Sequence, residues 1–296
     1  MSRVTGPLFC ISCASDQLST YALICGPGCA KPPRSLGASL PRGDLIRHSL
    51  NAHIRAGGLV LGEGAGVHGA LAKLEGALRT PLSEAGTITL ATGLALAGKS
   101  VVVELVDPDG LGRALDAVMD LADIAARTAG TFTPSVVIRV PGGTELRALN
   151  IPVYIAGRES DAAEQLAQAI ERGSVCILVD DTDPDAPTGL PEVAAGEPVV
   201  LREGAAVTVL AVGGASAAAL TGAEGFDAHV VEVRGAGSVA AAILRTGRLV
   251  VVGTLPGSLT ASLNEAFWSL EAPWVQLPRG SSADAVRNAI HSVLGA

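Results

Sequence analysis

The chain has 296 residues, enough for two domains of ordinary size. Hydrophobic residues make up 48% of it and aromatic residues only 3%, so the core must be built from Ala, Val and Leu. The net charge of −8 argues against nucleic acid as a partner, because nucleic acids are bound through basic surfaces. No apolar run reaches the length of a membrane span and no signal-peptide pattern opens the chain, so we expect a cytoplasmic protein with no membrane partner.

Residues 1–42 are predicted to form a leader rich in Cys, Pro and Gly, in which no hydrophobic period emerges. Four of the five cysteines of the chain lie in it as two close pairs, Cys10 with Cys13 and Cys25 with Cys29. Two such pairs are compatible with a tetrahedral zinc site. A disordered leader whose cysteines have no role is the simpler interpretation, and a disulfide or redox role is a third.

Residues 43–182 alternate between helical and strand patterns and are predicted to form a first domain. Strands rich in Val and Ile that alternate with helices are typical of a parallel sheet covered on both faces. The predicted strands are 59–61, 101–105, 135–140, 151–156 and 175–179, and the predicted helices are 44–54, 84–96, 111–127 and 161–172.

Residues 183–198 are acidic and contain Pro, which predicts a linker, and residues 199–296 repeat the alternation in a second domain. The fold class that follows is α/β, with two three-layer α/β/α domains whose sheets are largely parallel. The predicted strands of the second domain are 207–212, 229–233 and 249–252, and its predicted helices are 216–220, 238–245, 258–270 and 282–294.

One carboxylate, Glu84, stands at the start of an apolar helix. Ser83 before it is a suitable N-cap, and no charged residue follows until Lys99. Since a carboxylate is rarely buried without a partner, we expect the pKa of Glu84 to be raised, so that it can hold or give a proton near neutral pH. The simpler interpretation is a glutamate favoured by the positive end of the helix dipole.

The stretches Pro81–Gly86, Gly93–Gly98, Val102–Glu104 and Thr246–Val252 resemble a known family. It is the beta subunit of the thiamine-diphosphate-dependent decarboxylase (E1) component of 2-oxo acid dehydrogenases, and the resemblance extends from Asp44 to the C-terminus. It implies a transketolase-like pyrimidine-binding domain at 43–182 and a transketolase C-terminal-like domain at 199–296.

The resemblance also implies roles for individual residues around the cofactor. Glu84 is implied to donate a proton to the aminopyrimidine ring. Glu63 is implied to lie near the cofactor at a subunit contact, where it could couple to Glu84; a solvated glutamate in a Gly-rich turn is an equal alternative. The aromatic residue that the family packs on the ring is replaced by Gly110, which leaves Leu82 and Val106 to line the ring with apolar surface.

The chain lacks the Gly-Asp-Gly signature with which the family holds the diphosphate and its Mg²⁺. The resemblance therefore implies an alpha subunit that holds both, in an alpha2-beta2 heterotetramer. An acyl-carrier or lipoyl-bearing protein is the implied acceptor. The long loop that carries an active-site histidine in the family is replaced by a short bridge at 141–150 without histidine.

The sequence thus predicts the beta subunit of a heteromeric thiamine-diphosphate enzyme, active only with its alpha partner, in specialised metabolism. Its reaction would be decarboxylation of a 2-oxo acid or cleavage of a ketol donor, with transfer of the acyl or ketol unit. The alternative is a non-catalytic, beta-like scaffold or regulatory subunit. The retained Glu84 favours the enzyme, whereas the missing histidine loop and aromatic residue favour the scaffold.

Overall fold

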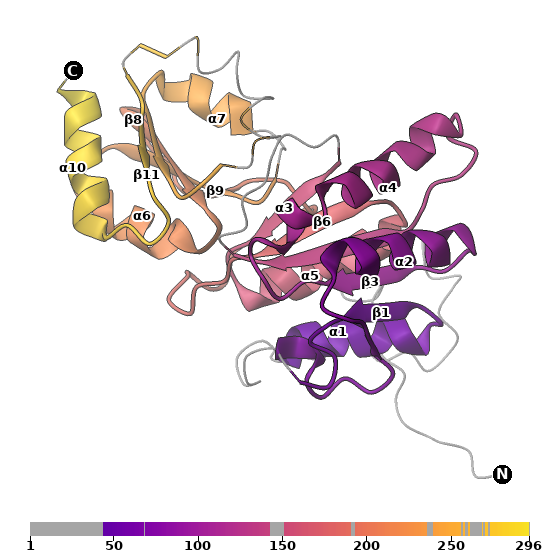
Figure 1. Ribbon diagram of the computed structural model, residues 1–296. Coiled ribbons are helices and arrows are strands. Elements are labelled where there is room, and N and C mark those ends of the chain that lie inside the picture. The colour runs from indigo at the N-terminus through magenta and orange to yellow at the C-terminus, as the bar shows by residue number, and fades with distance from the viewer. Residues whose placement is uncertain are drawn as a thin grey trace, which may run out of the picture.

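The computed structural model describes residues 44–67, 69–142, 151–190, 193–235, 239–255 and 273–295, with residues 257, 260, 268, 270 and 271. The cysteine-rich leader, most of the bridge at 141–150 and most of the predicted helix at 258–270 lie outside these residues. Two units, each built on one β-sheet, lie side by side (Figure 1). Within the described part of the chain, no helix is both long and apolar enough to cross a membrane.

The first sheet has six parallel strands in the order β2-β1-β3-β4-β6-β5. Every residue of β3 and β5 is buried, as expected for parallel strands that are covered on both faces. The edge strand β2 was not predicted, because a run of one apolar and one charged residue is too short to show a strand pattern. The strands are β1 (Leu59–Gly62), β2 (Leu78–Arg79), β3 (Val101–Glu104), β4 (Val136–Pro141), β5 (Val153–Ala156) and β6 (Cys176–Asp180).

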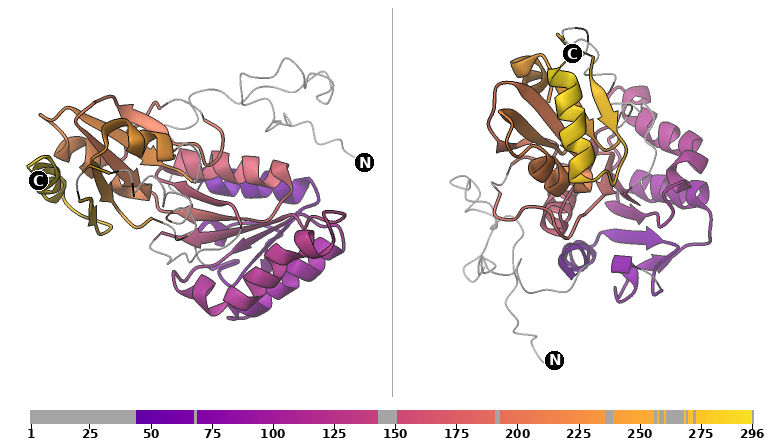
Figure 2. Two further views of the ribbon diagram at one scale, coloured as in Figure 1. Left: turned by 90° about the horizontal axis from the view of Figure 1, so that it is seen from above. Right: turned by 90° about the vertical axis from the view of Figure 1, so that its left-hand side faces the viewer.

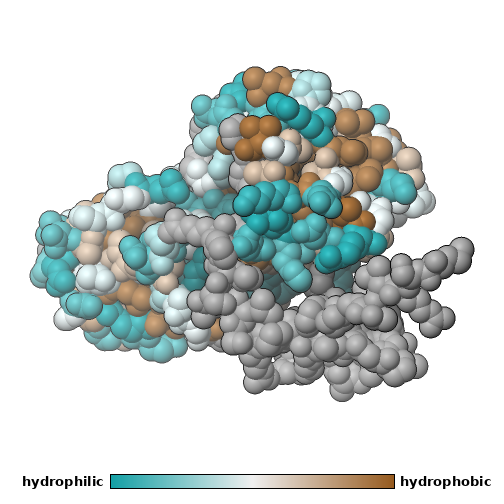
Figure 3. Space-filling model, turned by 90° about the horizontal axis from the view of Figure 1, so that it is seen from below, coloured by the Kyte–Doolittle hydropathy of each residue, from teal (hydrophilic) through white to brown (hydrophobic). Residues whose placement is uncertain are grey.

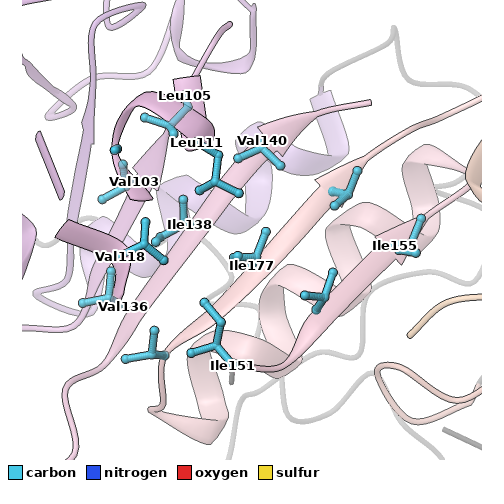
Figure 4. Packing of buried hydrophobic residues seen from close by; sticks show 14 of the residues in the cluster. Val103, Leu105, Leu111, Val118, Val136, Ile138, Val140, Ile151, Ile155 and Ile177 are labelled. Carbon is cyan, nitrogen blue, oxygen red and sulfur yellow. The ribbon is translucent and has the colours of Figure 1, made fainter. Parts of the chain in front are cut away.

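Helices cover both faces of this sheet, and the two helical layers are seen edge-on in Figure 2. One face carries α1 (Asp44–Arg55) and α5 (Glu159–Arg172), and the other carries α2 (Glu84–Leu96) and α4 (Leu115–Arg127). Leu111 and Val118 lie on the second face against Val103 and Ile138, all of them buried (Figure 4). A short 3-10 turn, η3 (Gly69–Leu71), lies between β1 and β2.

The prediction of one helix over 111–127 was wrong, because the segment is two helices. α3 (Gly110–Arg113) ends at Ala114, whose ψ of 14° is not helical, and α4 begins at the next residue. Alanine is the best helix former, so the break comes from packing rather than from local propensity. It turns α3 across the carboxyl end of β3 and directs Arg113 toward the start of α2.

The second sheet has five strands in the order β11-β10-β8-β9-β7, of which only β7 is antiparallel to its neighbour. Helices α6 (Ser216–Gly222) and α10 (Ala283–Leu294) pack on one face and α7 (Val239–Thr246) on the other, which confirms the α/β fold with three-layer units. The short edge strands β7 and β11 were not predicted. The strands are β7 (Val199–Arg202), β8 (Val207–Val212), β9 (Ala228–Val233), β10 (Leu249–Val252) and β11 (Val275–Leu277), and η4 (Gly213–Ala215) precedes α6.

The two units share one hydrophobic core, to which strands of both sheets contribute. The backbone of the first unit also bonds to that of the second, since the amide of Ile155 donates to the carbonyl of Arg234 at 2.7 Å. Buried charges pair across the same boundary: Glu232 on β9 with Arg158, and Arg234 with Asp161 on α5. The units are therefore firmly joined, while the exact domain limits at 182 and 199 stay a prediction.

Candidate active site

Glu84 is held at the carboxyl end of the first sheet by a capped helix start. Ser83 has extended backbone angles and its hydroxyl accepts a 3.2 Å hydrogen bond from the amide of Gly86, so it is the predicted N-cap. The hydroxyl of Thr87, one turn into α2, donates to that of Thr80 at 3.0 Å. These contacts fix the first turn of α2, and the Glu84 side chain is buried there, with 8% of the residue exposed.

The carboxylate of Glu84 is paired with Arg113, which the sequence analysis did not single out. Nη2 of Arg113 donates to Oε1 of Glu84, and the same nitrogen lies 2.6 Å from Oδ2 of Asp107. Asp107 belongs to the loop between β3 and α3, and its side chain is partly solvent-exposed. The three side chains form a charge cluster, Glu84–Arg113–Asp107, at the point where the segments after β2 and β3 meet.

The expected raised pKa of Glu84 is wrong for the subunit by itself. The hydrogen bond from Arg113 holds the pKa of Glu84 below its usual range, against the opposing effect of burial. The same cluster lowers the pKa of Asp107, again chiefly through the Arg113 hydrogen bond. The local sequence of α2 suggested an unpaired carboxyl, but its partner comes from 29 residues further along the chain.

Gly110 lies directly against the Glu84 side chain. A Cβ atom at position 110 would stand 3.0 Å from Cγ and 3.2 Å from Oε1 of Glu84, closer than most real contacts of this kind. Two apolar side chains on the adjoining segments, Leu82 and Val106, are exposed to solvent at 83% and 38%. A buried carboxylate, a bare glycine and exposed apolar groups fit a flat ring that presents a basic nitrogen, so these residues fit the aminopyrimidine half of the implied cofactor.

Glu63 follows β1, and its Oε1 atom is buried without a hydrogen-bond partner among the residues that the structure describes. Such an oxygen is costly to leave unpaired, which marks the position as a candidate ligand contact. The described contacts contain no bond between Glu63 and Glu84, and Glu84 is paired with Arg113 instead. Their coupling stays a prediction.

A second buried charge cluster lies further along the same edge of the sheet. Arg139 on β4 lies 2.7 Å from Oε2 of Glu104 and also pairs with Asp180. Burial raises the pKa of Glu104 despite this cation. The ion pairs join three neighbouring strands, so we interpret the cluster as a brace between β3, β4 and β6, although Oε2 of Glu104 and Nε of Arg139 lack a hydrogen bond among the described residues.

Sequence reasoning missed Arg113 and Asp107, because placing them beside Glu84 requires the order of the strands in the sheet. Strands β1 and β3 are parallel neighbours, with Gly62 opposite Glu104, so the segments that follow them emerge at the same edge. The segment after β3 carries Asp107 and Arg113, and the segment after β1 and β2 carries Glu84. Residues 44–67, 69–142, 151–190 and the other described parts hold no group of three or more His, Cys, Asp or Glu side chains placed to bind a metal.

The relatives found by comparison with known proteins are beta subunits of 2-oxo acid dehydrogenases. No family model matches the chain. The 3-methyl-2-oxobutanoate dehydrogenase subunit beta of Mycobacterium tuberculosis is 31% identical over 265 residues, which cover 73% of this chain and 76% of that relative. The pyruvate dehydrogenase E1 component subunit beta of Leifsonia xyli subsp. xyli is 27% identical over 266 residues, covering 73% of this chain and 78% of that relative.

Among solved structures, a split-gene transketolase in an inactive beta4 tetramer aligns with a TM-score of 0.65 and 20% identity. The alignment covers 85% of this chain and 97% of that one, and at this identity it shows the fold alone. The sequence relatives establish the family, because they combine sufficient identity with coverage of most of both chains. The chain belongs to the family of beta subunits of the thiamine-diphosphate-dependent 2-oxo acid dehydrogenase (E1) component.

Proposed function

We propose that this chain is the beta subunit of a heteromeric enzyme that cleaves a 2-oxo acid or ketol donor and transfers the acyl or ketol unit. The observation that carries the proposal is Glu84: a buried carboxylate at the capped start of a helix, beside exposed apolar side chains. Thiamine diphosphate, when bound, supplies the carbanion stabilisation that such a cleavage requires. In this proposal Glu84 holds a proton against the aminopyrimidine nitrogen, and Leu82 and Val106 exclude water from the ring.

The outer face of α2 supports a partner chain next to Glu84. Helices that are apolar on all sides are normally buried, and α2 carries no charge between Glu84 and Leu96. One face packs on the sheet through Ile88 and Ala91, yet the opposite face is exposed and apolar as well. The exposed face consists of Ala85, Gly86, Thr89, Leu90, Gly93, Leu96 and Ala97.

Figure 3 shows exposed hydrophobic residues, interspersed with hydrophilic ones, on the lobe at its upper right, which belongs to the first unit. Contiguous exposed apolar surface such as the outer face of α2 marks interaction sites in soluble proteins. We infer that an alpha subunit covers the outer face of α2 and closes the site beside Glu84. In this arrangement the alpha subunit holds the diphosphate and Mg²⁺, which the chain has no Gly-Asp-Gly motif to bind.

The test of this proposal is reconstitution with an alpha-type chain that carries Gly-Asp-Gly and co-purifies with this protein. Glu84→Gln should lower 2-oxo acid decarboxylation by about 10²-fold or more, the usual contribution of a placed general acid. Glu75→Gln removes an exposed glutamate and serves as the matched control, with unchanged turnover expected. Full activity in Glu84→Gln would overturn the proposal.

The partner surface has its own test. Leu90 on α2 and Val200 on β7 are exposed to nearly the same extent, at 48% and 46%. Leu90→Lys should weaken co-purification with the alpha-type chain, whereas Val200→Lys should leave it intact. Equal binding by both variants would show that α2 is not part of the interface with the alpha-type chain.

A second candidate function, a non-catalytic beta-like subunit, is favoured by two observations. The carboxylate of Glu84 is already hydrogen-bonded to Arg113, and Gly110 lies at the position where the family has an aromatic residue. If this role is correct, the partner binds thiamine diphosphate equally well with wild-type chain and with Glu84→Gln. Isothermal titration of the cofactor into both complexes separates the two candidates.

A further inference from the structure

Arg113 is paired with Glu84, the side chain on which the proposed function depends. Its guanidinium is bonded to Glu84 and Asp107 at once, and half of the side chain is exposed to solvent. A carboxyl group can give a proton only while it is protonated, and the hydrogen bond from Arg113 lowers the pKa of Glu84 and so favours the ionised form. In the subunit alone, Arg113 therefore opposes the protonation that proton donation requires.

The contact depends on Gly110, which begins the short helix that carries Arg113. A Cβ at that position would press on Cγ and Oε1 of Glu84, and any larger side chain would fill the space over the carboxylate. The backbone at 110 thus leaves the room in which the guanidinium meets Glu84. Arg113 lies three residues later, less than one turn of α3 further on.

Asp107 gives Arg113 a second place to bind. It already accepts a 2.6 Å bond from the same nitrogen, and its exposed position allows the guanidinium to remain there in water. Arg113 can therefore release Glu84 without losing all of its countercharge. A swing of a half-exposed arginine requires no change in the backbone and is fast compared with turnover.

We propose that Arg113 is a positioning residue that gates Glu84: it pairs with Glu84 in the free subunit and keeps only Asp107 when the cofactor ring is in place. This inference rests on the proposed function, because it assumes that Glu84 meets the ring nitrogen. On release, Glu84 takes up one proton from solvent, which it then holds at the ring. The gate confines the protonated acid to the assembled, loaded site.

Few charged groups lie near Glu84, so the effect of Arg113 on its pKa can be tested by single substitutions. Arg113 from α3 and Asp107 from the preceding loop are the charged groups that bear on it, and α2 carries no other charge. Glu104 on β3 and Arg139 on β4 are paired with each other. The acidic residues of α4 that lie nearest in sequence are exposed, namely Asp116, Asp120 and Asp123.

The first experiment uses the full chain alone. Carboxyl ¹³C resonances are followed against pH in protein labelled at glutamate, with the Glu84 signal assigned by its absence in Glu84→Gln. In wild type it should titrate below the usual range, and in Arg113→Gln its pKa should move upward. Arg113→Lys keeps the charge and should resemble wild type, and Asp107→Asn should move the pKa further down. Identical titrations in wild type and Arg113→Gln overturn the gate.

The second experiment measures thiamine diphosphate affinity, with Mg²⁺, in the complex with the alpha-type chain. Arg113→Gln should bind the cofactor about two- to fivefold more tightly than wild type, since no ion pair has to be broken. Asp107→Asn should bind it more weakly, because Arg113 then has only Glu84. Unchanged affinity in both variants overturns the gate, whereas unchanged affinity and turnover in Glu84→Gln overturn the proposed function itself.

Discussion

Arg158 and Glu232 form a bidentate ion pair across the boundary between the two units, with both N–O distances at 2.9 Å. Arg158 precedes α5 of the first unit and Glu232 lies on β9 of the second, and both are buried. The carboxylate of Glu232 also accepts bonds from Arg234 and from the hydroxyl of Ser216 at 2.8 Å. One acidic side chain therefore holds three partners at the junction.

We predict that Glu232→Gln lowers the free energy of unfolding by about 3–5 kcal/mol, because it leaves two buried guanidinium groups short of countercharge. Glu203→Gln is the control: Glu203 is exposed, pairs with the exposed Arg245 and lies 3.5 Å from Nδ1 of His229, and the loss of its charge should change stability by less than about 1 kcal/mol. Urea unfolding followed by circular dichroism measures both. A cost below 1 kcal/mol in Glu232→Gln would mean that the junction does not depend on this pair.

Asp161 gives the same cluster a pH dependence. Burial raises the pKa of Asp161 to about 6 in the fold, although Arg158 lies 2.6 Å away. The raised pKa favours the protonated form, so the contribution of Asp161 is complete below its unfolded pKa near 3.8 and is lost as the pH rises through 6. Between pH 4 and pH 6.5, wild type should lose up to about 3 kcal/mol relative to Asp161→Asn. Asp120→Asn, on the exposed side of α4, should follow wild type throughout.

Alanine variants at two glycines with positive φ allow the cost of backbone strain to be measured separately from the cost of steric crowding. Gly225 has a φ of +86° and open space around it, so Gly225→Ala should cost only the left-handed backbone, about 1–2 kcal/mol. Gly213 has a φ of +60°, and a Cβ there would stand 2.2 Å from Oδ2 of Asp181. Gly213→Ala should therefore cost more than Gly225→Ala by about 1–3 kcal/mol. Equal melting temperatures for the two variants would contradict the close approach of Asp181 to the turn after β8.

A substitution at Gly93 tests the outer face of α2 through two effects, on the stability of the subunit and on the binding of its partner. It lies in the interior of the helix, it is exposed, and a Cβ there would meet nothing within 4 Å. Gly93→Ala should stabilise the isolated chain by about 0.5–1 kcal/mol, because alanine restricts the unfolded backbone. The added methyl group should also weaken binding of the alpha-type chain if that chain packs closely on the helix. Thermal unfolding of the subunit and titration of the complex measure the two effects, and a destabilised subunit would contradict the first.

The sequence was sufficient for the elements that carry strong local patterns. The Val and Ile runs that became β3, β8 and β10 predicted the parallel sheets, and Ser83 predicted the start of α2. The edge strands β2 and β11 have two or three residues with no buried face, so they leave no pattern to read. The break at Ala114 runs against propensity and becomes visible only once α3 is placed on the sheet.

The candidate site was harder to predict than the fold, because its charges come from separate segments. Glu84 could be singled out from its own neighbours, but its pKa depends on Arg113 and Asp107. Their meeting requires the order of β1 and β3 in the sheet to be known. The junction cluster shows the same limit, since Arg158 and Glu232 are 74 residues apart.

The apolar outer face of α2 has a consequence for how the protein must be produced. A chain produced without its partner subunit exposes an uncharged apolar helix face to solvent. Two such faces can associate with each other as readily as with the partner. We therefore expect the isolated chain to self-associate increasingly as its concentration rises, so in the cell the two chains should be made in matched amounts. Joint expression, rather than mixing after purification, is the route by which this protein should be recovered in its working form.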